Sequence, residues 1–307
     1  MRSRALGFIL VRIVLASLGV VTVVFLALRL AGDPVAISMP PGTPLDVQEM
    51  YRKAWGLDGT LWQQYLRFTG KLLQGDLGHS VAFDRPAVDV ILSHLSATLR
   101  LMFGASLVAA VYAYLSTGFF WVAAEKRRFL RATELLGSLN AVIFALSDFV
   151  MAILAIIIFG LYLGVSFSPE TGRWNLIIGS FCVGLPFAAY FALASRRLAE
   201  SHLKHPQVQF FTDATSTTWR NYHSLFLPVL LRQLTSLLLL RFVWLAAGTF
   251  VVESVLGIRG IGYLTIRSVQ QRDINITQGV VLMIALLSVM ANVISDASQS
   301  RKPPGPP

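Results

Sequence analysis

Apolar runs that are long enough to cross a bilayer dominate this sequence and limit what it can fold into. About 20 helical residues cross the hydrocarbon core of a membrane, where a helix satisfies its own backbone hydrogen bonds. The composition agrees, because 55% of the 307 residues are hydrophobic and 14% are charged, against about 25% charged in soluble domains. The sequence therefore predicts an all-α, polytopic membrane protein with about six transmembrane helices and argues against a soluble enzyme. The runs cover residues 8–31, 97–122, 134–163, 176–196, 229–252 and 276–297.

The runs divide the chain into an N-terminal transmembrane helix, an extracytoplasmic loop, a transmembrane core and a short tail. The first run is too long for the apolar part of a signal peptide, and no clear small-residue cleavage site follows it, so we expect it to be retained. We expect the core to contain a cytoplasmic loop at about 197–228 and the Pro-rich tail to be flexible. The four parts are residues 1–31, 32–96, 97–298 and 299–307.

The basic excess of the chain, a net charge of +10, predicts its orientation. Lys and Arg concentrate in the cytoplasmic segments of membrane proteins, so we interpret them as a sign of topology and expect no nucleic-acid partner. The loop 32–96 has five basic and seven acidic residues, whereas the segment around 253–274 is basic and runs against the rule. The pattern predicts both termini in the cytoplasm. The basic residues of the expected cytoplasmic segments are Arg2, Arg4, Lys126, Arg127, Arg128, Arg131, Arg196, Arg197, Lys204, Arg220, Arg301 and Lys302.

Two polar loops contain segments with helical periodicity. The outer one predicts an amphipathic helix, which is either a structural lid or a docking surface for an extracytoplasmic partner. In the inner loop, residues 207–222 suit a helix too polar to span a membrane, which is either an ordinary surface helix or a binding site for a soluble subunit. The apolar residues of the outer segment are Leu61, Trp62, Tyr65, Leu66, Phe68, Leu72 and Leu73.

Motifs of enzyme chemistry are missing from the sequence, while charges lie inside its apolar runs. There is no G-x-x-x-x-G-K-[ST] phosphate loop, no H-E-x-x-H and no G-x-S-x-G, so we expect no catalytic residue and no metal site. A charge inside a span costs about 3 kcal/mol on insertion scales and is usually paired or functional. Asp148 and Arg241 are such charges, and we expect them to pair or to line a polar cavity. Glu253 lies at the outer end of the fifth run, where simply facing water is the alternative to a functional role.

Short motifs follow one another in a fixed order along nearly the whole chain. Arg29-Leu-Ala-Gly-Asp-Pro34 follows the first run, and then come Trp55-Gly-Leu-Asp58, Gln64-Tyr65, Gly75-Asp-Leu-Gly-His-Ser80, Arg85-Pro86 and Ala97-Thr-Leu99. Near the C-terminus lie Phe250-Val-Val-Glu-Ser254, Gly260-Ile-Gly262, Arg272-Asp273, Gln278-Gly-Val-Val281, Asn292 and Asp296. In this order and spacing the motifs resemble those of the first permease subunit of the dipeptide/oligopeptide/nickel type of ABC importer.

The resemblance implies an inner-membrane permease with the type I ABC importer fold and with several partners. These are a second permease subunit, two cytoplasmic ATPases that bind the ATP, an extracytoplasmic solute-binding protein and membrane lipid. The permease itself would hold no cofactor and would form half of the pathway for a peptide, nickel or similar small solute. The alternatives are an ATP-independent secondary carrier or channel and, less favoured, an intramembrane enzyme.

The resemblance also assigns candidate functional residues, with departures from the family pattern. Asp148, Arg241 and Glu253 are the candidates for the translocation pathway. Trp219 stands where the family has a glycine, Arg259 and Asp148 stand where it has proline, and the terminal D-P-R is absent. The candidates for coupling to the ATPase are Asp213, Ala214, Thr215, Ser216, Thr217, Thr218, Trp219, Arg220, Asn221, Tyr222 and His223.

Overall fold

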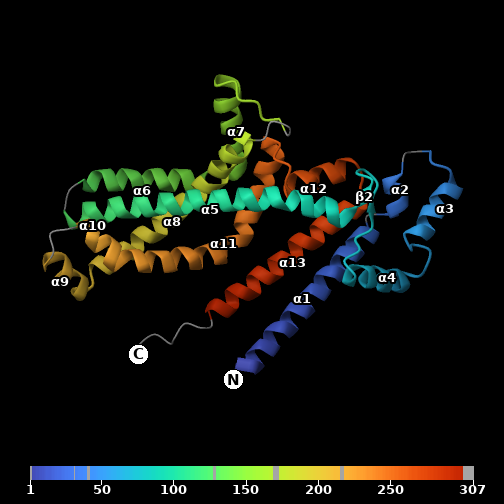
Figure 1. Cartoon of the computed structure of the whole chain (residues 1–307), viewed down its shortest axis with the longest axis horizontal. Helices are drawn as coiled ribbons and strands as arrows, with labels where there is room; N and C mark the ends of the chain where they lie inside the picture. Colours follow the sequence, from blue (N-terminus) through green and yellow to red (C-terminus); the bar gives the residue numbers. More distant parts are fainter. Residues whose placement is uncertain are drawn as a thin grey trace. The chain divides into compact units, whose positions relative to one another are not determined.

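The computed structural model describes residues 2–30, 32–39, 42–126, 129–168, 173–214 and 218–299, and almost all of them are helical (Figure 1). The predicted all-α class is therefore confirmed. The chain forms two compact units, one of residues 1–97 with 259–307 and one of residues 98–258. The tail beyond residue 299 lies outside the described residues.

Two long apolar helices form the centre of the first unit. Helices α1 (Arg2–Leu30) and α13 (Ile274–Gln299) pack against each other and run antiparallel, so that α1 begins and α13 ends at the same end of the pair (Figure 1). The other elements of this unit are α2 (Pro34–Ser38), α3 (Leu45–Ala54), α4 (Leu61–Leu73), α12 (Ile261–Gln270) and the paired short strands β1 (His79–Ser80) and β2 (Arg85–Pro86).

The buried carboxylate of Asp273, from the Arg272-Asp273 motif, fastens the start of α13 to the β1–β2 turn. Its Oδ1 atom accepts a hydrogen bond from the Ile276 amide at 3.1 Å, and its Oδ2 atom accepts from the Ser80 hydroxyl at 2.5 Å and the Ala82 amide at 3.1 Å. A carboxylate at the start of a helix satisfies amide groups that have no partner within the helix. One side chain thus caps the helix and anchors the turn.

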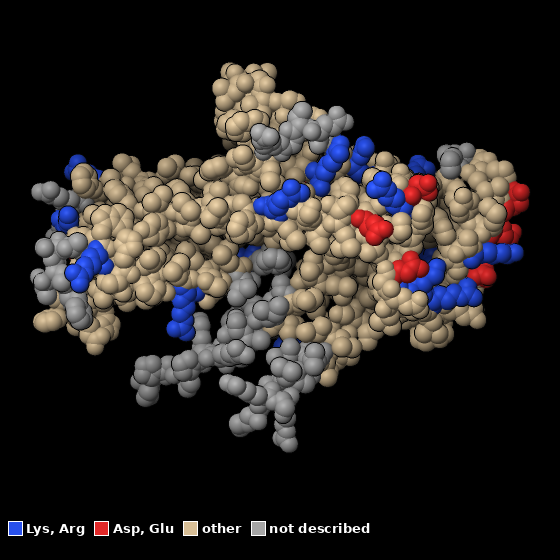
Figure 2. Space-filling model, in the orientation of Figure 1, with Lys and Arg blue, Asp and Glu red and all other residues tan. Residues whose placement is uncertain are grey.

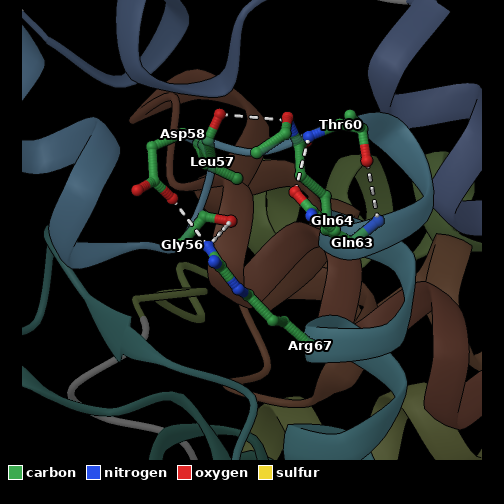
Figure 3. A network of polar contacts seen from close by, with 8 residues as sticks. Gly56, Leu57, Asp58, Thr60, Gln63, Gln64 and Arg67 are labelled. Carbon is green, nitrogen blue, oxygen red and sulfur yellow. Dashed lines mark hydrogen bonds and ion pairs between the residues drawn. The ribbon is translucent and has the colours of Figure 1, made fainter.

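The predicted amphipathic helix is confirmed as α4, and its first turn is held by polar contacts (Figure 3). Thr60 and Gln63 form a capping box in which each side chain accepts from the other residue's backbone amide. The Arg67 guanidinium donates to the Asp58 carboxylate at 2.6 Å and to the Gly56 carbonyl at 3.3 Å. The hydrogen bond from Arg67 lowers the pKa of Asp58 below its ordinary value.

Helix α4 packs one edge on α1 and leaves an apolar face exposed. Phe25 of α1 contacts Tyr65 and Phe68, with ring centroids 5.4 and 5.7 Å apart, and the Tyr65 hydroxyl lies 2.8 Å from that of Thr22. These contacts fix the rotation of α4 about its own axis. The exposed apolar residues are Leu61, Trp62, Leu66 and Leu73.

The second unit is a bundle of long helices that approach closely where small residues meet. Gly104 lies against Ser180, and Gly184 lies against Ala105 and Val108, with no space for a further carbon at either glycine. Small residues allow such close approach in helix pairs of membrane proteins. The elements are the part of α5 (Ala87–Glu125) after residue 97, α6 (Leu130–Ala145), α7 (Asp148–Ala155), the π-helical segment η1 (Ile156–Tyr162), α8 (Arg173–Leu203), α9 (Pro206–Ala214), α10 (Thr218–Asn221), η2 (Tyr222–Phe226) and α11 (Leu227–Leu256).

The third apolar run, expected at 134–163 to be long enough for tilt or partial re-entry, is bent. A 95° bend separates the helix before Leu146 from the helix that continues from Asp148 to Tyr162. The Ser147 hydroxyl accepts from the Val150 amide and so starts α7 as a new helix. By length and composition, two helices of the described part can each cross a membrane alone, Ala87–Glu125 and Trp174–Leu203. The number rises to four if each of two bent helix pairs is one span, namely Arg131–Ala145 with Asp148–Tyr162 and Trp244–Leu256 with Ile261–Gln270.

Candidate coupling segment and pathway residues

The predicted coupling residues that the structure describes fall on three short elements of the second unit, with Tyr222 and His223 in η2. Asp213 and Ala214 end α9, and Thr218 to Asn221 form α10, while residues 215–217 lie outside the described residues. The sequence predicted one helix over residues 207–222. In the structure the described part of this range belongs to α9, α10 and the first residue of η2. On the face shown in Figure 2, basic side chains gather at the end of this unit that carries α9 and α10.

An aromatic cluster holds the C-terminal half of the coupling segment. We call the four rings Trp121, His202, Tyr222 and Phe226 the aromatic anchor. Trp121 stacks on Phe226 with centroids 5.1 Å apart, and its centroid lies 6.2 Å from Tyr222 and 6.3 Å from His202. Trp121, Tyr222 and Phe226 are fully buried. Aromatic rings bury large areas, so the anchor joins the ends of α5 and α8 to the coupling segment.

Hydrogen bonds from α5 complete the attachment. Glu125 accepts from the Trp121 indole N–H at 3.0 Å and from the Asn221 side-chain amide at 3.3 Å. The Tyr222 hydroxyl donates to the Tyr114 carbonyl at 2.9 Å. Buried polar groups of this kind require partners, so these contacts fix the position of α10 relative to α5.

The residue that departs from the family pattern, Trp219, packs on a glycine of α5. A Cβ atom placed on Gly118 would lie 3.2 Å from Cη2 and Cζ3 of the Trp219 indole and 3.4 Å from Cε1 of Tyr222. Trp219 sits within α10 and is 48% exposed. The bulky side chain at position 219 is thus accommodated because Gly118 has none.

The expected pair of Asp148 and Arg241 is wrong, since no hydrogen bond or ion pair joins these two described side chains. The Asp148 carboxylate, in the first turn of α7, lies against Gly248 of α11, where a Cβ would overlap it. The Arg241 guanidinium lies over the rings of Tyr190 and Trp244, 4.9 and 5.6 Å from their centroids. Arg241 precedes Gly248 by seven residues, which is about 10 Å along a helix.

Glu253 is completely buried, so the alternative that it simply faces water is wrong. The reason is that α11 continues beyond the predicted end of the run at residue 252 to Leu256. Gly257 then ends the helix in the left-handed conformation, with φ of 66°. Its amide and that of Ile258 both donate to the Glu253 carbonyl. Glu253 therefore belongs to the last turn of the helix and not to the following loop.

Sequence reasoning missed the residues that hold the coupling segment. Trp121 and Glu125 stand at i and i+4 at the end of the second apolar run, which places them on one face of a helix. This spacing was the available signal. His202, at the end of α8, contacts the rings of Trp121 and Phe226. Within the described ranges no three His, Cys, Asp or Glu side chains gather as a metal site.

The long apolar helices and the bent helix pairs are features of an integral membrane protein. Residues 117–301, which are more than half of the chain, match the family of binding-protein-dependent transport system inner membrane components. The chain belongs to this family, as the motifs suggested. It is therefore an inner-membrane permease subunit of an ABC importer and not an enzyme, and its class works with ATPases, a second permease and a solute-binding protein.

Curated relatives support the same class over most of the chain. The chain is 27% identical over 273 residues to the glutathione transport system permease protein GsiC of Escherichia coli strain K12, and the match covers 87% of this chain and 86% of the relative. The same protein from Escherichia coli O6:H1 (strain CFT073) and from Shigella boydii serotype 4 matches with equal identity and coverage.

Proposed function

We propose that this chain forms half of the translocation pathway of an ATP-driven importer for a small peptide-like solute. Its relatives are named as glutathione permeases, and glutathione is a tripeptide, which favours a peptide-like solute over nickel. ATP is bound by the partner ATPases, so the chain needs no cofactor of its own. We also propose that both termini lie in the cytoplasm, as the distribution of Lys and Arg predicts.

The attachment of the coupling segment to α5 is the observation that carries this proposal. In our account, residues 213–223 dock on an ATPase, and ATP favours one state of the complex through its different affinity for the two states. A displacement of α10 then reaches α5 through Trp219 and Gly118 and reaches α8 through the aromatic anchor. Asp148, Arg241 and Glu253 remain our candidates for the pathway, as three separate positions and not as a pair.

Uptake by proteoliposomes tests the proposal. The complete complex, with its binding protein outside and ATP inside, is offered labelled glutathione or labelled nickel. We expect glutathione uptake with ATP and no uptake with a non-hydrolysable analogue. Uptake without ATP would favour the carrier or channel alternative, and uptake of nickel alone would contradict the peptide-like solute.

A further inference from the structure

A pocket of about 680 Å³ opens within the first unit, and no role has been given to it so far. Its volume lies in the range of about 300–1,000 Å³ that is typical of small-molecule sites. Its walls come from α1, α4, the start of α13 and the loops that join α3, α4 and β1. We call it the outer pocket, and the lining residues used below are Phe25, Arg29, Arg67, Phe68, Lys71 and Asp76.

The outer pocket is positively charged. Its lining contains three cations (Arg29, Arg67 and Lys71) and one carboxylate (Asp76), a surplus of two positive charges. Asp58 pairs with Arg67 from outside the lining, at 2.6 Å, and lowers this surplus to +1. The surplus favours an anionic ligand.

Two of the cations have donors to offer. The Arg29 Nε atom is buried without a hydrogen-bond partner, although a buried donor of this kind ordinarily has one. Asp33, whose charge also acts on Arg29, forms its ion pair with Arg52. Among the described residues, the Lys71 ammonium has no hydrogen bond or ion pair. The Nε atom itself is closed to a ligand because it is buried, so the donors that a ligand could reach are the Lys71 ammonium and the terminal nitrogens of Arg29.

The walls of the pocket are held in place before any ligand binds. The contacts of Arg67 with Asp58 and Gly56 fix the loop before α4 (Figure 3). Phe25 and Phe68 stack on each other and give the pocket an apolar side. Apolar walls with a few fixed polar groups are the usual make-up of a ligand site, and fixed walls reduce the ordering cost of binding.

We propose that the outer pocket binds the carboxylate of an imported solute, with Lys71 and Arg29 as its donors. Cationic side chains bind carboxylates through charge-assisted hydrogen bonds. The inference rests on the proposed function in one respect, since it takes the ligand to be a solute of the importer. It adds that the solute is recognised outside the membrane through a negative group.

Calorimetric titration of the complete complex in nanodiscs tests the inference. The probes are N-acetyl-tri-alanine with a free C-terminal carboxylate and the same peptide with a C-terminal amide, which differ only in the negative charge. We expect the acid to bind at least tenfold more tightly than the amide. The Lys71→Met variant should weaken binding of the acid by about tenfold and leave binding of the amide unchanged.

A matched control and three contrary outcomes make the test decisive. Lys53→Met removes an exposed lysine of α3 that does not line the pocket, and it should bind both peptides like the parent protein. Equal affinity for acid and amide, or an equal loss in Lys71→Met and Lys53→Met, would overturn the inference, as would no binding of the acid. The proposed function is tested separately, because retention of the ATPases by each variant is measured on the same preparation. Failure of the inference can thus be distinguished from failure of the proposed function.

Discussion

The contact between Trp219 and Gly118 makes a prediction about the one coupling residue that departs most from its family. A methyl group on Gly118 would meet the indole at 3.2 Å, closer than the optimal 3.5–4.0 Å between carbon atoms. Overpacking costs about 1–3 kcal/mol, which the helix preference for Ala over Gly of about 0.8–1 kcal/mol partly offsets. We therefore expect Gly118→Ala alone to be neutral or mildly destabilising.

Removing the indole should reverse the effect of the alanine. About half of Trp219 is buried, so Trp219→Ala removes roughly 100 Å² of contact and at most about 2.5 kcal/mol of stability. In that background Gly118→Ala should stabilise by about 1 kcal/mol, since only the helix preference remains. The double-mutant cycle should thus show a coupling equal to the overpacking cost, about 1–3 kcal/mol.

The cycle is measured by unfolding in mild detergent and by retention of the ATPases on an affinity column. Gly19→Ala is the matched control, because a Cβ on this helical glycine of α1 meets nothing within 4 Å. It should show no coupling to Trp219→Ala. Additive effects of Gly118→Ala and Trp219→Ala would refute the packing argument, and unchanged ATPase retention in every variant would refute its link to coupling.

Three further predictions follow from single contacts. Gly248→Ala should destabilise the second unit by about 1–3 kcal/mol, and Asp148→Ala should relieve that loss; equal losses in both backgrounds would show that the two residues do not touch. Asp273→Ala should cost about 2–3 kcal/mol and speed hydrogen exchange at the Ala82 amide, which a purely local capping role would leave slow. Because Arg67 lowers the pKa of Asp58, ionised Asp58 stabilises the loop before α4 at any pH above the ordinary carboxyl pKa. This stabilisation is lost as the pH falls through the lowered pKa. Exchange of the α4 amides should therefore rise in acid, and Asp58→Asn should abolish the rise.

Local patterns in the sequence were sufficient for α4 and for the long apolar helices, but not for α2, α3 and α12. The spacing from Leu61 to Leu73 predicted α4 because its apolar face and its capping box are both encoded within a few residues. The bend in the third run also has a local cause, the serine cap at position 147. Whether a segment forms a helix depends mainly on residues close to it in the sequence, so helices and their caps can be predicted without a structure.

Contacts between residues that are far apart in the sequence could not be predicted from it. Glu253 is completely buried in the last turn of α11, and Trp219 fits because position 118, about a hundred residues earlier, is a glycine. The predicted pairing of Asp148 with Arg241 was wrong because it was inferred from their similar depth in two spans. In the structure Asp148 lies against Gly248, and Arg241 lies over the rings of Tyr190 and Trp244. The outer pocket likewise joins segments from both ends of the chain.

Affinity purification of the tagged chain from mild detergent, with mass spectrometry of the proteins retained, tests the central claim most directly. Our account predicts a second permease and P-loop ATPases in stoichiometric amounts, and their loss when residues 213–223 are disrupted. A clean monomer or homo-oligomer, under conditions that preserve other ABC complexes, would contradict it.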